Sequence, residues 1–137
     1  MVGSVAAMRA IVAESPEVLT WRGAPCVAPA AGEVLIRAAA AGVNRADLLQ
    51  AAGLYPPPSG ASDTLGLEVS GVIAAVGDEV SDWTIGQQVC ALLAGGGYAE
   101  YVAVPAPQVL PVPDGVDLLD AAGLPEVACT VWSNLVL

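Results

Sequence analysis

The chain has 137 residues, of which 55% are hydrophobic and only 13% are charged. This length corresponds to one domain of ordinary size. Gly and Pro break up the longest uncharged stretches, and the apolar segment from Val127 to Leu137 is too short to span a membrane, so no membrane-spanning helix is predicted. The net charge is −10, with four scattered arginines and no lysine. Such a chain should repel phosphate backbones, so neither a nucleic-acid partner nor a membrane partner is expected.

The three cysteines are widely spaced and contain no Cys-x-x-Cys pair. An odd number at these spacings gives no disulfide framework. The N-terminus lacks the basic start and the continuous apolar core of a secretory signal. We therefore expect a reducing, cytoplasmic location. Residues 1–7 are small and featureless, and we interpret them as an extension or a cloning remnant.

The first third of the chain predicts strands separated by turns. Apolar and β-branched residues between turn signals are typical of strands. A hairpin is expected around Ser15-Pro16, followed by a longer strand that continues through an alanine run. The expected strands cover residues 9–13, 18–21 and 33–41.

A helix is predicted over residues 44–52. Asn44 is a good N-cap, and Asp47 lies three residues later, where its carboxylate can reach back to the cap amide. Gly53 is expected to end this helix in a left-handed conformation.

The second half predicts further short strands and a C-terminal helix. Glycine at position 71 indicates a strand that bends or is closely approached. No G-x-G-x-x-G motif follows a strand, so the elements of a Rossmann fold are absent. The body is expected to be mainly β and barrel-like, with a core of small and β-branched side chains. The expected strands cover residues 68–76, 85–92, 98–104 and 109–112, and the expected helix covers residues 126–137.

A series of short motifs carries a family resemblance from about Met8 to the C-terminus. Each motif is weak, but their order and spacing together resemble the zinc-free quinone oxidoreductase branch of the medium-chain dehydrogenase/reductases, and within it the p53-inducible type. The motifs are Gly42-Val43-Asn44-Arg45-Ala46-Asp47, Gly53-Leu54-Tyr55 with the prolines that follow, Gly66 to Val72, Val76-Gly77, and Ala122-Gly123-Leu124-Pro125 followed by Thr130.

The resemblance implies a GroES-like fold, a partly open β-barrel with a few short helices. Residues 8–124 would form this catalytic domain in incomplete form, and residues 125–137 would begin a helix that leads to a nucleotide-binding domain. In the family that Rossmann domain follows directly, and the chain then returns to complete the barrel. Both parts are absent here, so the fragment alone is expected to be inactive.

No metal site is expected. Zinc-dependent relatives carry Cys at the position of Asn44 and His at that of Leu67, with a third ligand near Glu126. Zinc requires three or four N, S or O donors at about 2.0–2.3 Å. Leu67 is no ligand, Asn44 is a poor one, and the chain has no histidine.

The implied activity of the full-length protein is NADPH-dependent reduction of a quinone or a conjugated carbonyl. The resemblance implies that Asn44 contacts the nicotinamide ribose or the substrate, that Tyr55 orients the quinone oxygen, and that Thr130 contacts the carboxamide. Each residue also has a structural alternative. Asn44 would be only an N-cap, Tyr55 would pack on the prolines after it, and Thr130 would bond to its own helix backbone.

Two other functions stay open. One is a free-standing GroES-like module that binds partners without catalysis, and the other is part of a zinc-free enoyl reductase. NADPH would be bound mainly by the missing domain, because its phosphates need basic contacts that this chain lacks. Dimers of the family pair through that domain, so the oligomeric state is open, with a homodimer as one alternative.

Several other residues have structural interpretations. Glu68 is expected to be a buried carboxylate near the cleft, paired with Arg45. Cys90 and Cys129 are interpreted as inert core thiols, and Tyr98 as a packing residue.

Overall fold

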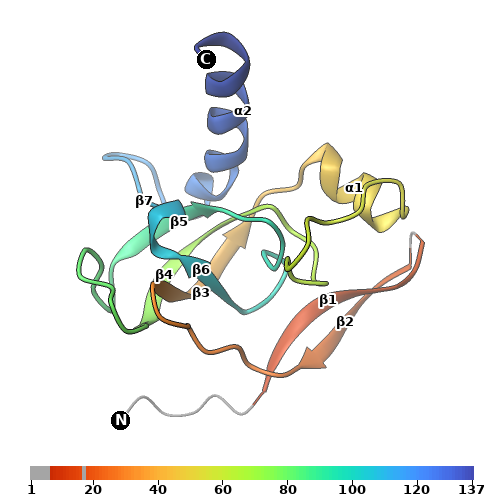
Figure 1. Cartoon of the computed structure of the whole chain (residues 1–137), viewed down its shortest axis with the longest axis horizontal. Helices are drawn as coiled ribbons and strands as arrows, with labels where there is room; N and C mark the ends of the chain where they lie inside the picture. The colour runs from red at the N-terminus through yellow and green to blue at the C-terminus, as the bar shows by residue number, and fades with distance from the viewer. Residues whose placement is uncertain (1–6, 17) are drawn as a thin grey trace.

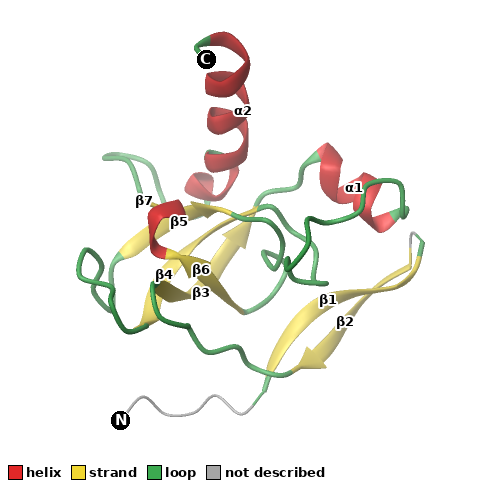
Figure 2. Ribbon diagram, viewed as in Figure 1, coloured by secondary structure: helices red, strands yellow, loops and turns green. Residues whose placement is uncertain are grey.

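Antiparallel strands make up most of the fold (Figures 1 and 2). The computed structural model describes residues 7–16 and 18–137. Residues 1–6, most of the expected N-terminal extension, therefore lie outside the described residues. The strands are β1 (Met8–Ser15), β2 (Val18–Ala24), β3 (Glu33–Ala41), β4 (Glu68–Val76), β5 (Gln88–Leu92), β6 (Tyr101–Pro105) and β7 (Val109–Pro111).

The five-stranded sheet has the order β6-β3-β4-β5-β7, and β1 and β2 form a separate hairpin. The outer strands β6 and β7 do not pair with each other, so the sheet curls around its core without closing. This arrangement confirms the predicted mainly β, partly open GroES-like barrel. In the described part of the chain, neither α-helix has the length and hydrophobicity needed to cross a membrane.

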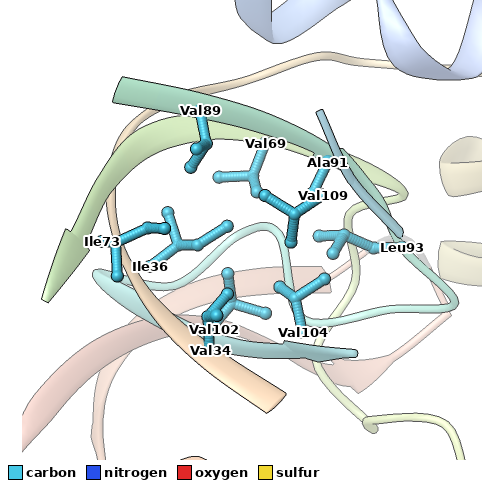
Figure 3. Close-up of a cluster of buried hydrophobic side chains, with 10 residues drawn as sticks. All are labelled: Val34, Ile36, Val69, Ile73, Val89, Ala91, Leu93, Val102, Val104 and Val109. Carbon is cyan, nitrogen blue, oxygen red and sulfur yellow. The ribbon is translucent and has the colours of Figure 1, made fainter. Parts of the chain in front are cut away.

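The core of the sheet consists of aliphatic side chains from five strands (Figure 3). Val34 and Ile36 of β3, and Val102 and Val104 of β6, are two residues apart, so each pair points to the same face of its strand. This period of two turns the apolar side chains of the cluster toward the inside of the curled sheet, while alternate residues such as Leu35 and Cys90 are buried on its other face. The buried cluster is Val34, Ile36, Val69, Ile73, Val89, Ala91, Leu93, Val102, Val104 and Val109.

Two α-helices and two short 3-10 helices accompany the sheet. Helix α1 (Arg45–Ala51) begins after the predicted N-cap, and Gly53 follows it with φ of 72°. Helix α2 (Pro125–Leu135) projects away from the sheet in Figure 1, and its last turns are highly exposed. The 3-10 helices are η1 (Ala106–Gln108) and η2 (Asp120–Gly123).

The strand expected over residues 98–104 begins only at Tyr101 in the sheet. The preceding residues bond instead to the hairpin. The Ile11 N–H donates to the Tyr98 carbonyl at 2.8 Å, and the Glu100 N–H donates to the Arg9 carbonyl at 3.0 Å. This segment therefore attaches the hairpin to the rest of the domain.

Gly71 of β4 pairs with Ala38 of β3 and is closely approached by the β3 backbone. The pairing register shifts between Ala38 and Ala40, directly opposite this glycine. A Cβ atom on Gly71 would lie 2.2 Å from the Arg37 carbonyl oxygen. The predicted close approach is therefore confirmed, because only a residue without a side chain fits here.

We expect Gly71→Ala to lower the free energy of unfolding by about 2 kcal/mol, because the added methyl group collides with backbone that cannot move away easily. Urea denaturation measures this change. Gly23→Ala is the matched control, since a Cβ on Gly23 of β2 meets no atom within 4 Å. Equal effects of the two substitutions would contradict the close approach.

Candidate functional site

A groove of about 380 Å³ lies between α1 with its following loop and α2. Both helices are in the upper half of Figure 1. The floor is apolar and comes from Leu67 and the end of β5. The groove is lined by Gln50, Tyr55, Pro58, Leu67, Leu92, Leu93, Ala94, Glu126, Cys129, Thr130 and Ser133.

Two of the three predicted site residues line this groove together. Tyr55 comes from the loop after α1 and is 47% exposed, and Thr130 comes from α2. The Thr130 hydroxyl donates to Glu126 Oε1 at 3.1 Å rather than to a backbone carbonyl. With Ser133 of α2, the groove thus carries three hydroxyl groups above an apolar floor.

Asn44 is not among the residues that line the groove. It is the N-cap of α1, and its backbone N–H donates to Asp47 Oδ2 at 2.8 Å, as the spacing predicted. Its side-chain Nδ2 donates to Glu68 Oε1 at 2.9 Å. Asn44 is therefore connected to the groove through Glu68, whose neighbour Leu67 forms part of the floor.

Two carboxylates are buried behind the groove. Asp47 and Glu68 are each only 2% exposed. The Tyr98 hydroxyl lies 2.9 Å from Asp47 Oδ2 and 3.2 Å from the Gly42 carbonyl oxygen. Burial, the hydrogen bond to Asp47, and the negative charges of Asp47 and Glu68 raise the pKa of Tyr98 above the usual tyrosine range. The Tyr98 hydroxyl is thus a protonated hydrogen-bond donor to a buried carboxylate. The sequence predicted only a packing role for this residue.

Glu68 bonds to partners other than the expected one. Its Oε1 accepts from Asn44, and its Oε2 accepts from the Glu126 N–H at 3.0 Å. In residues 7–16 and 18–137 the one ion pair joins Arg22 to Glu14, so the expected pairing with Arg45 is wrong. Hydrogen bonds, rather than a cation, hold this buried carboxylate.

The cysteines differ in their surroundings. Cys90 is buried in β5, and burial together with the charge of Glu68 raises the pKa of its thiol. An inert core thiol is the expected behaviour of such a group. Cys129, in contrast, is exposed on α2 and lines the groove, so its assignment to the core is wrong. The sequence indicated the helix but not which of its faces packs on the sheet.

The groove suits a flat, neutral ring better than a phosphate. Its lining contains hydroxyl and amide groups and an apolar floor, but the only charged side chain is that of Glu126. A pyrophosphate would need basic groups from outside the groove, because its lining contains none. Among the described residues, no three His, Cys, Asp or Glu side chains converge as a metal site would require.

Comparison with known proteins finds one matching family. Residues 30–114 match the family model of the alcohol dehydrogenase GroES-like domain. The synaptic vesicle membrane protein VAT-1 homolog of Danio rerio is 38% identical over 76% of this chain and 22% of its own length. The trans-enoyl reductase opdC of Penicillium oxalicum is 38% identical over 90% of this chain and 36% of its own length.

A solved structure gives the same result. The quinone oxidoreductase of Pseudomonas syringae superimposes with a TM-score of 0.80 and 33% identity, over 95% of this chain and 41% of that protein. The chain therefore spans well under half the length of each of these three proteins.

The raised pKa of Tyr98 predicts a specific alkaline titration. Tyrosinate absorbance is measured against pH for the wild type and for Tyr98→Phe, and the difference between the two curves reports Tyr98. We expect this difference to have its midpoint above about pH 10, the usual pKa of tyrosine. Because folding raises this pKa, the stabilisation is complete below about pH 10 and is lost as the pH rises further. Wild type should lose stability there more steeply than Tyr98→Phe. A midpoint at or below the usual value would refute the buried Tyr98–Asp47 contact.

Proposed function

The chain belongs to the alcohol dehydrogenase GroES-like domain family of the medium-chain dehydrogenase/reductases, and we propose that it forms the substrate-side domain of a zinc-independent NADPH:quinone oxidoreductase. The observation that carries this proposal is the groove in which Tyr55 and Thr130 lie above an apolar floor. Such a groove binds a flat conjugated acceptor beside a nicotinamide ring without a metal ion. The acceptor would be a quinone or another conjugated carbonyl.

We assign the residues as follows. When bound, NADPH supplies the hydride. The protein orients the reactants, excludes water and supplies hydrogen bonds. The Tyr55 phenol donates to the acceptor oxygen, where negative charge develops during hydride transfer. The Thr130 hydroxyl bonds to the carboxamide. Asn44 uses one amide hydrogen for Glu68 and has a second that can donate to the ribose or to the acceptor.

The phosphates of the cofactor require a second domain. The lining of the groove offers no basic side chain for them. We propose that α2 leads into a nucleotide-binding domain, which would cover its exposed apolar residues. This assignment is supported by the exposure of Val131, Trp132 and Leu135, which are 50%, 59% and 79% exposed. The chain by itself would then be inactive, and its cytoplasmic location and its dimerisation through that second domain stay predictions.

An enoyl reductase is the second candidate. It is favoured by the similarity to the trans-enoyl reductase of Penicillium oxalicum, which extends over 90% of this chain. Both reactions deliver hydride to a carbon conjugated with a carbonyl, so the same groove would serve either. The two differ in the substrate, which is a free quinone in one case and an acyl thioester in the other.

A domain exchange tests the proposal. We would replace the matching part of the Pseudomonas syringae quinone oxidoreductase with this chain and follow NADPH oxidation. We expect turnover with 1,4-benzoquinone by the chimaera and none by the 137-residue chain alone. Circular dichroism and quenching of protein fluorescence by NADPH would verify folding and cofactor binding. A folded, NADPH-binding chimaera that reduces only crotonyl thioesters would favour the enoyl reductase, and one that reduces neither would favour a binding module.

Tyr55→Phe in the same chimaera should lower kcat/KM for the quinone by about tenfold, because one donor to the developing oxyanion is lost. Its unfolding midpoint should change little, since the Tyr55 side chain is 47% exposed. Tyr101→Phe is the matched control, because Tyr101 lies on β6 and outside the groove. Equal kinetics for wild type and Tyr55→Phe would remove Tyr55 from the site.

A further inference from the structure

The Glu68 carboxylate lies between the beginnings of both α-helices. One oxygen accepts from the side chain of Asn44, the N-cap of α1, at 2.9 Å. The other accepts from the backbone N–H of Glu126, in the first turn of α2, at 3.0 Å. Glu68 itself begins β4 in the middle of the five-stranded sheet. A single buried side chain thus connects the sheet with both helices.

The bond to Glu126 provides α2 with a cap that its own sequence lacks. The first N–H groups of a helix have no acceptor within the helix. The N-cap residue of α2 is Leu124, which has no side-chain acceptor, and Glu68 supplies one from 58 residues earlier in the chain. A carboxylate is also favoured at this end of a helix, where the peptide dipoles leave partial positive charge.

The Glu68 carboxylate occupies the space that a side chain at position 42 would fill. A Cβ atom on Gly42 would lie 2.0 Å from Glu68 Oε1 and 2.6 Å from its Cδ. Gly42 lies just before Asn44, so the missing side chain lets the carboxylate reach the N-cap. Both the glycine and the acidic residue are therefore needed for the connection between Asn44 and Glu126.

The connected helices form the two walls of the groove. The loop after α1 carries Tyr55, and α2 carries Thr130, one helical turn after Glu126. Any change in the bond between Glu68 and Glu126 would shift the α2 wall relative to the α1 wall.

We propose that Glu68 is a positioning residue that sets the separation of Tyr55 and Thr130. It does so by holding Asn44 and the Glu126 N–H at fixed distances on its two oxygens. The connection itself is independent of the reaction, whereas its effect on turnover rests on the proposed function.

Amide hydrogen exchange on the 137-residue chain tests the connection directly. We expect the Glu126 amide of the wild type to exchange at least about tenfold more slowly than the Val127 amide, because a hydrogen bond to a charged acceptor protects it. Val127 is the internal control, since it lies in the same turn and no described residue accepts from its N–H. Equal exchange at the two amides would overturn the proposal, and this comparison needs no variant.

Glu68→Gln gives the second readout. Glutamine replaces one acceptor oxygen with an NH2 donor and leaves the other oxygen uncharged, so the bond to the Glu126 N–H is lost or weakened and exchange at Glu126 should rise about tenfold towards that of Val127. Asp63→Asn removes the same charge at an exposed position and should leave Glu126 protected. Protection that survives Glu68→Gln, with native circular dichroism, would overturn the proposal.

The catalytic consequence is measured in the active chimaera. Glu68→Gln should lower kcat/KM about tenfold through misalignment, while the pH profile keeps its shape because Glu68 transfers no proton. A shifted pH profile would instead assign proton transfer to Glu68 and overturn the positioning role. If the chimaera is inactive but Glu126 is protected only when Glu68 is present, the proposed function fails and the connection stands.

Discussion

The pair of hydrogen bonds accepted by Glu68 is the interaction on which the geometry of the site depends. The sheet can form from its own strands, and α1 is capped by its own sequence. Among the described residues, Glu68 is the one side chain that bonds both to the first turn of α2 and to the N-cap of α1. Because the groove lies between these helices, its shape follows from one buried carboxylate and its two donors.

A second constraint is that two buried carboxylates lie close together in a chain with few basic residues. Asp47 accepts from the Asn44 N–H and from Tyr98, and Glu68 accepts from Asn44 and Glu126. Hydrogen bonds from several donors thus take the place of a salt bridge. They are needed because burying a charge without partners costs folding free energy. Burial raises the pKa of both the Tyr98 phenol and the Cys90 thiol, and negative charge adds to it: that of Asp47 and Glu68 at Tyr98, and that of Glu68 at Cys90.

The lining of the groove does not discriminate between a quinone and an enoyl thioester. Its floor is apolar, and its donors are hydroxyl and amide groups that would serve either carbonyl. A size or charge selection beyond this would have to come from surfaces that the 137 residues do not include. Under the proposed function, the domain would orient the acceptor for hydride transfer without selecting between the two substrate classes.

The sequence by itself determined the local elements, because their signals lie within a few residues. Asn44 and Asp47 are three residues apart and cap α1 as predicted, Gly53 ends that helix, and the alternating Val and Ile residues form the core. The tertiary structure decided the contacts between distant residues. Tyr98 meets Asp47 across 51 residues, and Glu68 meets Glu126 across 58. No local pattern encodes such pairs, since they depend on how the sheet curls and on which face of α2 packs against it.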